Sequence, residues 1–352
     1  NFNYSKTLIH KLNFKLTSDQ IKSINEINKD LESDTKMFRL LQGDVGSGKT
    51  VVALISSLNV ISCGYQVAIM APTEILAQQH FTLTKKLFEK NINISLLTSK
   101  TNYAERKKVI DNVANNKINI LIGTHSLFQD KVKFKKLGLI VIDEQHKFGV
   151  KQRKKLSDKG GKDCDILLMS ATPIPRTMIM TIFGDMDVSI IKTKPKNRKN
   201  VITYSKLNTK IDEVILFVKK IILNGGQIFW VCPLIEESSR VDHQSSIKRY
   251  EFLNKRFKNK VGLIHGSLNK EEKDKILIDF LKKKIDILVS TTVIEVGIDF
   301  PNANLIIIEN ANKFGLAQLH QLRGRVGRGS KQGMCILLFK DGLSKNAIKR
   351  IK

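Results

Sequence analysis

Cysteine is scarce in this sequence, and the few cysteines are too far apart to form a motif. Four of them are spread over 352 residues, at least 68 residues apart, at Cys63, Cys164, Cys232 and Cys335. This spacing excludes a C-x-x-C motif, a zinc pattern and a disulfide framework, and the seven histidines show no metal-ligand spacing either. Such cysteine usage is typical of a reducing compartment, so we expect a cytoplasmic protein.

Long hydrophobic runs are missing as well. No apolar stretch approaches the roughly 18 residues that a membrane-spanning helix needs, and the amino terminus does not resemble a signal peptide. We therefore expect no membrane partner. The sequence begins with Asn1 rather than methionine, which predicts a piece of a longer protein. With 352 residues, 41% of them hydrophobic, it is long enough for two domains with ordinary cores.

Acidic residues are much fewer than basic residues. The chain has 33 acidic and 60 basic residues and a net charge of +27. An excess of this size suits a polyanionic partner such as nucleic acid, because phosphates bind lysine and arginine with release of counterions. However, 48 of the basic residues are lysines and 12 are arginines, and asparagine and isoleucine are also abundant, as an AT-rich genome would produce. Charge alone therefore leaves both explanations open.

Residues 43–50, GDVGSGKT, are the most informative segment of the chain. They fit the phosphate-loop pattern G-x-x-x-x-G-K-S/T, and they lie between an expected strand at 37–42 and an expected helix at 51–62. The glycines let backbone N–H groups approach phosphates, while the lysine binds the β- and γ-phosphates and the threonine hydroxyl binds Mg²⁺. A glycine-rich turn without a ligand is the alternative, and the flanking strand and helix argue against it. The predicted nucleotide contacts are Gly43, Asp44, Gly46, Ser47, Gly48, Lys49 and Thr50.

Continuous apolar runs in both halves predict parallel strands that are covered on both faces. In the first half these runs are 37–42, 66–71, 94–98, 118–123, 137–143 and 165–171, with helical patterns at 74–90 and 103–116. In the second half they are 227–233, 261–266, 285–291, 304–310 and 333–339, without a second phosphate loop. The basic segment 192–200, which contains Pro195, predicts the boundary. We therefore expect two α/β domains, 1–194 and 195–352.

A pair of acidic residues follows the apolar run at 137–143. Asp143 ends this run and Glu144 comes next, at what would be the carboxyl edge of a parallel sheet. We expect Asp143 to hold Mg²⁺ together with Thr50, and Glu144 to orient and deprotonate the water that attacks the γ-phosphate. Two acids that end a strand in solvent are the alternative.

The segment 170–177 follows the next apolar run. Ser170 and Thr172 are short hydroxyl donors that could sense the state of Glu144 or His146 and couple it to the rest of the chain. Without further information, Ser-Ala-Thr-Pro is also an ordinary strand-ending turn.

Residues 318–328, QLHQLRGRVGR, are the sharpest feature of the second half. Arg323, Arg325 and Arg328 alternate with glycines, which lets the backbone approach closely while arginines supply planar donors for phosphate oxygens. A domain without its own phosphate loop can supply such an arginine to its neighbour's site, which is typically worth ~10³–10⁵ in rate. The same residues could instead form a patch for DNA phosphates.

Together these motifs resemble the two motor domains of superfamily 2 helicases, and specifically the bacterial RecG-type branched-DNA helicases. The resemblance covers nearly the whole chain and is carried by LTSDQ (16–20), GDVGSGKT (43–50), APTEILAQQH (71–80), GTHSLFQ (123–129), DEQHKFGV (143–150), SATPIPRT (170–177), WVCPLIEES (230–238), GLIHG (262–266), TTVIEVGIDFPNA (291–303) and ENANKFGLAQLHQLRGRVGR (309–328). The transcription-repair coupling factor shares much of this pattern, but DEQH, GDVGSGKT and WVCPLIEES favour the RecG type.

The resemblance implies roles for individual residues. Gln20, with Phe14, would contact adenine. Arg325 and Arg328 would reach the γ-phosphate, with Gln321 beside them. Gly297 and Asp299 would couple the second domain to the nucleotide. The implied contacts with the DNA backbone are Pro72, Thr73, Thr124, His125, Thr291 and Thr292. Hydroxyls and loop N–H groups suit that task because they bind phosphates without reading bases, although a lone threonine at a strand end is more often a cap.

The resemblance also implies a fold and a function. We expect two RecA-like parallel-sheet domains in tandem, a helicase ATP-binding domain over 1–194 and a helicase C-terminal domain over 195–352 that is truncated at its end. The chain would use ATP and Mg²⁺ as the motor of a monomeric DNA helicase or translocase that acts on stalled forks and Holliday junctions in recombination and repair. Single-strand binding protein is an implied partner. The family's wedge domain and carboxyl-terminal helical hairpin have no counterpart in this sequence.

Three alternatives stay open at this point. The chain could be a duplex-DNA translocase of the coupling-factor type, or an ATP-switched module that grips DNA without moving. It could also be a phosphate-loop NTPase unrelated to nucleic acid, whose ATP turnover would be indifferent to DNA.

Overall fold

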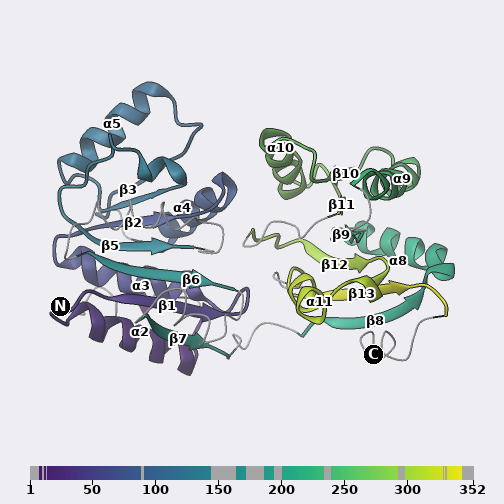
Figure 1. Cartoon of the computed structure of the whole chain (residues 1–352), viewed down its shortest axis with the longest axis horizontal. Coiled ribbons are helices and arrows are strands. Elements are labelled where there is room, and N and C mark those ends of the chain that lie inside the picture. Colours follow the sequence, from purple (N-terminus) through teal and green to yellow (C-terminus); the bar gives the residue numbers. More distant parts are fainter. Residues whose placement is uncertain are drawn as a thin grey trace. The chain divides into compact units, whose positions relative to one another are not determined.

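The computed structural model describes residues 8–9, 12, 14–88, 91–143, 164–171, 186–193, 200–233, 239–291, 298–327, 329 and 331–342. The chain divides into two compact units, Asn1–Pro195 and Lys196–Lys352, and each is built on its own parallel β-sheet with helices packed against it (Figure 1). The predicted boundary between 194 and 195 stays a prediction, because residues 194–199 lie outside the described ranges.

The first unit contains a seven-stranded sheet in the order β3-β4-β2-β5-β6-β1-β7, in which the pairs of neighbouring strands are parallel. The strands are β1 (Phe38–Gly43), β2 (Gln66–Met70), β3 (Ile94–Leu97), β4 (Ile120–Gly123), β5 (Leu137–Ile142), β6 (Asp165–Ser170) and β7 (Asp187–Ile191). The helices are α2 (Ser18–Leu31), α3 (Lys49–Ser62), α4 (Glu74–Leu87), α5 (Tyr103–Ala114) and the short 3-10 helix η1 (His125–Phe128).

The strands of this sheet are buried on both faces. Leu40 and Leu41 are neighbours in β1 and both are 0% exposed. Because successive strand residues point to opposite faces, they fill two different core layers. Leu40 belongs to the layer that Val109 and Ile110 of α5 cover. This two-sided burial explains why the strands read as continuous apolar runs in the sequence.

The second unit contains a six-stranded sheet in the order β10-β11-β9-β12-β13-β8, again with parallel neighbours. The strands are β8 (Ile202–Leu207), β9 (Gln227–Val231), β10 (Val261–Ile264), β11 (Ile287–Ser290), β12 (Ala303–Ile308) and β13 (Met334–Phe339). The helices are α8 (Ile211–Leu223), α9 (Ser239–Phe257), α10 (Lys270–Leu281), α11 (Leu316–Arg323) and the 3-10 helices η3 (Asn208–Lys210) and η4 (Ala311–Lys313).

Aromatic side chains fill one of the core layers of the second unit. The rings of Phe229, Phe280 and Phe300 have centroids 5.2–5.4 Å apart and meet in tilted or edge-on contacts. All three are at most 2% exposed. Trp230, the neighbour of Phe229 in β9, lies in the other layer with Val218 of α8. The predicted architecture of two tandem parallel-sheet α/β domains is therefore confirmed.

No helix in the described ranges combines the length and the apolar character that a membrane crossing requires.

Candidate active site

The phosphate loop connects the carboxyl end of β1 to the amino end of α3. Gly46 and Gly48 have φ angles of +78° and +92°, in the left-handed region that favours glycine. Lys49 is only 8% exposed. Its Nζ donates to the carbonyl oxygens of Gly43 at 2.7 Å and Asp44 at 3.1 Å. The loop therefore curls around the ammonium group of its own lysine, and the predicted contacts with phosphates stay a prediction.

Gln20 supports the loop from helix α2. Its Nε2 donates to the carbonyl oxygen of Ser47 at 2.7 Å, and its Oε1 accepts from the backbone N–H of Thr17 at 2.9 Å. Gln20 is 1% exposed, whereas Phe14, the other residue assigned to adenine, is 38% exposed. The amide of Gln20 thus joins the cap of α2 to the phosphate loop.

Helix α2 is held in place by two polar links, one to the residues that follow the edge strand β7 and one to β1 beside it. Asp19 accepts from the backbone N–H groups of Thr193 at 2.8 Å and Lys192 at 2.9 Å. These hydrogen bonds, that of Thr193 first, keep the pKa of Asp19 below its usual value. Arg39 of β1 forms a bidentate pair with Asp30, at 2.6 and 3.1 Å. Sequence reasoning missed Arg39, although an arginine within an otherwise apolar strand pattern is a signal of a buried pair.

Asp143 lies at the carboxyl end of β5, where its backbone N–H donates to the carbonyl oxygen of Met70. Its Oδ2 is 2.9 Å from Nε2 of His80 in helix α4. Both side chains are buried, with 7% and 6% of their residues' surface exposed. His80 was not among the predicted site residues. The available signal was helical spacing, because His80 lies four residues after the buried Leu76 and therefore on the same face of α4.

Ser170 lies at the carboxyl edge of the sheet, on the strand between Asp143 and the phosphate loop. It ends β6, which separates β5 from β1 in the sheet, and it pairs in register with Gln42 immediately before the phosphate loop. Its side chain is 0% exposed. The neighbouring predicted residues Glu144, His146 and Thr172 lie outside the described residues.

Two of the predicted DNA-contacting segments follow adjacent strands. Pro72 and Thr73 come after β2, and Thr124 and His125 come after β4, so all four lie at the same edge of the sheet. The hydroxyl of Thr73 accepts from the backbone N–H of Leu76 at 3.4 Å and caps α4. Pro72, Thr73 and Thr124 are buried, and His125 is exposed. Thr73 therefore has a structural role whether or not it also contacts DNA.

The predicted residues of the second unit differ in burial. Thr291 directly follows β11 and is 4% exposed, while Asp299 is exposed and Gln321 of α11 is half-buried. Arg325 is 2% exposed. Thr292, Gly297 and Arg328 lie outside the described residues.

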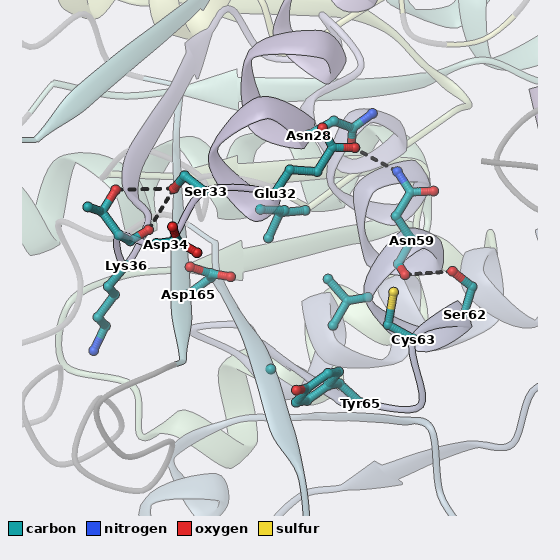
Figure 2. A pocket seen from close by; sticks show the side chains of 14 residues that line it. Asn28, Glu32, Ser33, Asp34, Lys36, Asn59, Ser62, Cys63, Tyr65 and Asp165 are labelled. Carbon is teal, nitrogen blue, oxygen red and sulfur yellow. Dashed lines mark hydrogen bonds between the residues drawn. The ribbon is translucent and has the colours of Figure 1, made fainter. Parts of the chain in front are cut away.

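A cavity of about 490 Å³ lies in the first unit, but not near the phosphate loop. Its lining includes Lys36 before β1, Asp165 at the start of β6 and Cys63 after α3, so it lies at the amino edge of the sheet (Figure 2). Ligands of open parallel sheets bind at the carboxyl edge, where the phosphate loop is. This cavity is therefore separate from the candidate nucleotide site.

Comparison with protein families gives the class. Residues 17–181 match the DEAD/DEAH box helicase family, and residues 209–330 match the helicase conserved C-terminal domain. The chain thus carries the two-domain core of a helicase, with the phosphate loop and Asp143 in the first domain and Arg325 in the second.

Within this class the chain is similar in sequence to RecG helicases. It is 49% identical to the ATP-dependent DNA helicase RecG of Thermotoga maritima over 351 residues, which are 99% of this chain and 45% of that protein. It is 50% identical to the ATP-dependent DNA helicase RecG of Bacillus subtilis over 94% of this chain and 49% of that protein. The chain therefore spans a little under half the length of these relatives.

Solved helicase structures are also similar to this chain. The structure of RecG bound to a three-way DNA junction matches 99% of this chain and 46% of its own length, with a TM-score of 0.87 and 45% identity. Mss116p bound to single-stranded RNA and AMP-PNP matches 97% of this chain and 72% of its own length, with a TM-score of 0.67 and 21% identity. The second similarity concerns the fold alone.

Proposed function

We propose that this chain is the motor of an ATP-dependent DNA helicase or translocase that acts on branched DNA, such as stalled replication forks and Holliday junctions, in recombination and repair. The observation that carries the proposal is the phosphate loop with buried Lys49 at the carboxyl edge of a parallel sheet. The RecG relatives support the choice of DNA as the substrate, because those proteins are ATP-dependent DNA helicases and one of them is bound to a three-way DNA junction.

The loop fits a nucleoside triphosphate. The buried Ser47 hydroxyl makes no hydrogen bond with the described residues, so it can donate to a phosphate oxygen. Two left-handed glycines and the amino end of α3 add backbone N–H groups and a favourable dipole. Lys49, which now donates to carbonyl oxygens of its own loop, would turn to the β- and γ-phosphates.

Mg²⁺ fits the same edge of the sheet. Thr50 in the first turn of α3 supplies a hydroxyl oxygen and Asp143 supplies a carboxylate oxygen, both of which suit this cation. When bound, Mg²⁺ would neutralise charge on the phosphate oxygens.

The remaining roles are proposals that rest on motif position. Glu144 would orient and deprotonate the attacking water, and Ser170 and Thr172 would couple the site to the rest of the chain. Gln321, Arg325 and Arg328 of the second unit would serve the same nucleotide. Action as a monomer and an interaction with single-strand binding protein rest on the resemblance alone.

The test is ATP turnover by the 352-residue chain without DNA and with forked, duplex and single-stranded DNA. We expect DNA to stimulate turnover, and we expect Lys49→Ala to lower it by about 10²–10³-fold, the typical cost of losing one preorganised charge contact. Lys36→Ala removes an exposed lysine at the opposite edge of the sheet and should leave turnover unchanged.

An ATP turnover rate that does not change when DNA is added would instead indicate an NTPase unrelated to nucleic acid. Strand displacement by the full-length protein separates a motor from a module that only grips DNA. A preference for linear duplex over forked DNA would favour a translocase of the coupling-factor type.

A further inference from the structure

Helix α4 physically connects two parts of the proposed motor. Its amino end follows Pro72 and Thr73, which belong to the proposed DNA-contacting edge, and Thr73 caps the helix. Two turns further on, His80 contacts Asp143 at the proposed nucleotide site, with Nε2 and Oδ2 2.9 Å apart. One rigid helix of 14 residues therefore carries both contacts.

The contact between His80 and Asp143 is directional. A carboxylate can only accept, so the ring donates from Nε2–H and fixes one oxygen of Asp143. His80 is 6% exposed and Asp143 is 7% exposed, so water competes little for this hydrogen bond. Partners of this kind orient a metal-binding group, and their loss typically lowers metal affinity or activity 10–100-fold.

His80 is in turn held by the helix. The hydroxyl of Thr84, which is 0% exposed, donates to the carbonyl oxygen of His80 at 2.6 Å. The ring of His80 lies on the buried face of α4 with Leu76. A displacement of α4 would therefore displace the hydrogen bond to Asp143 as well.

We propose that His80 is a positioning residue that sets the orientation of Asp143 for Mg²⁺–nucleotide and couples it, through α4, to DNA bound at Pro72 and Thr73. The inference rests on the proposed function. It adds a residue that acts on the nucleotide site through Asp143, not through the nucleotide itself.

The experiment compares His80→Phe, which keeps a ring of similar size but cannot donate, with His80→Gln, whose Nε2 can donate over a similar reach. Gln78→Ala, an exposed change on the same helix, is the matched control. Affinity for a fluorescent ATP analogue is measured with Mg²⁺ and with EDTA, and ATP turnover is measured with and without forked DNA. Circular dichroism checks that each variant is folded.

We expect His80→Phe to lower affinity 10–100-fold in Mg²⁺ but little in EDTA, and to reduce stimulation by DNA while DNA binding itself persists. His80→Gln should recover most of both properties. The proposal is overturned if His80→Phe behaves as the unsubstituted chain does, or if its affinity falls equally in Mg²⁺ and in EDTA without recovery in His80→Gln.

A different result would contradict the proposed function. If ATP turnover by the unsubstituted chain ignores DNA, the motor proposal and the coupling through α4 are both wrong. The comparison of Mg²⁺ with EDTA still decides whether His80 positions Asp143.

Discussion

Gly48 combines two constraints that exclude a side chain. Its φ is +92°, and a Cβ at this position would lie 2.2 Å from Nε2 of Gln20. Gln20 cannot swing away freely, because it is buried and bonded to Ser47 and Thr17. Any side chain at Gly48 therefore disturbs both the phosphate loop and the cap of α2.

A comparison of two glycine substitutions separates these constraints. Gly64, at the other end of α3, has a φ of +83° but open space around its Cβ position. Gly64→Ala should lower the free energy of unfolding by about 1–2 kcal/mol, the cost of the left-handed conformation alone. Gly48→Ala should lower it further and also weaken nucleotide binding, which denaturant titration and equilibrium binding would measure. Equal effects of the two changes would contradict the role given to Gln20.

At the scale of elements, the start of β6 carries a carboxyl group with an unusual environment. Asp165 accepts from the backbone N–H of Met37 at 2.8 Å and so joins β6 to the entry of β1. Burial raises the pKa of Asp165 above its usual value, and this effect outweighs the opposing hydrogen bond from Met37 and the charge of Lys36. The folded chain therefore binds this proton more tightly than the unfolded chain does.

The sign of the resulting pH dependence follows from that difference. The stability contributed by Asp165 is fully present below its unfolded pKa of about 4 and is lost as the pH rises through the raised folded pKa. Asp165→Asn keeps an acceptor for Met37 and stays neutral, so it should be more stable than the unsubstituted chain at pH 7. This advantage should shrink toward pH 4 in thermal melts. Asp34→Asn, an exposed change nearby, is the control, and an advantage independent of pH would refute the assignment.

The interior strands were predictable from the sequence because burial on both faces leaves a continuous apolar run. The runs at 37–42 and 165–171 became β1 (Phe38–Gly43) and β6 (Asp165–Ser170). The edge strands β7 and β8 were missed. They carry exposed residues such as Ile190 and Tyr204, both 49% exposed, and so lack such a run.

The segment 43–50 could be found in the sequence because phosphate-loop chemistry fixes glycine and lysine at set spacings, and the structure places it between β1 and α3 as expected. The pair of His80 and Asp143 was not predictable, because it joins residues 63 positions apart through the fold. Asp143 can be recognised in the sequence as an acidic residue that follows an apolar run, but its hydrogen-bond partner His80 cannot.

At the scale of the whole molecule, the proposal that both units serve one nucleotide is tested at Arg328. Arg328→Ala should lower DNA-stimulated ATP turnover by about 10³–10⁵-fold, the usual contribution of an arginine supplied to a phosphoryl-transfer site. ATP binding at the phosphate loop should persist. Arg323→Ala changes an exposed arginine of the same segment and should have little effect. Unchanged turnover in Arg328→Ala would show that the second unit supplies no such group.

The position of β1 in its sheet also has a consequence for biosynthesis. In the described sheet β1 lies between β6 and β7, so its partners, Asp165–Ser170 and Asp187–Ile191, are translated long after the phosphate loop. At roughly 5–20 residues per second, the ribosome needs on the order of ten seconds to make the residues in between. During that time the emerging loop and its strand have no neighbouring strand to pair with. On the proposed function, a nascent chain would therefore gain an ATP-binding loop only after β6 has left the ribosome.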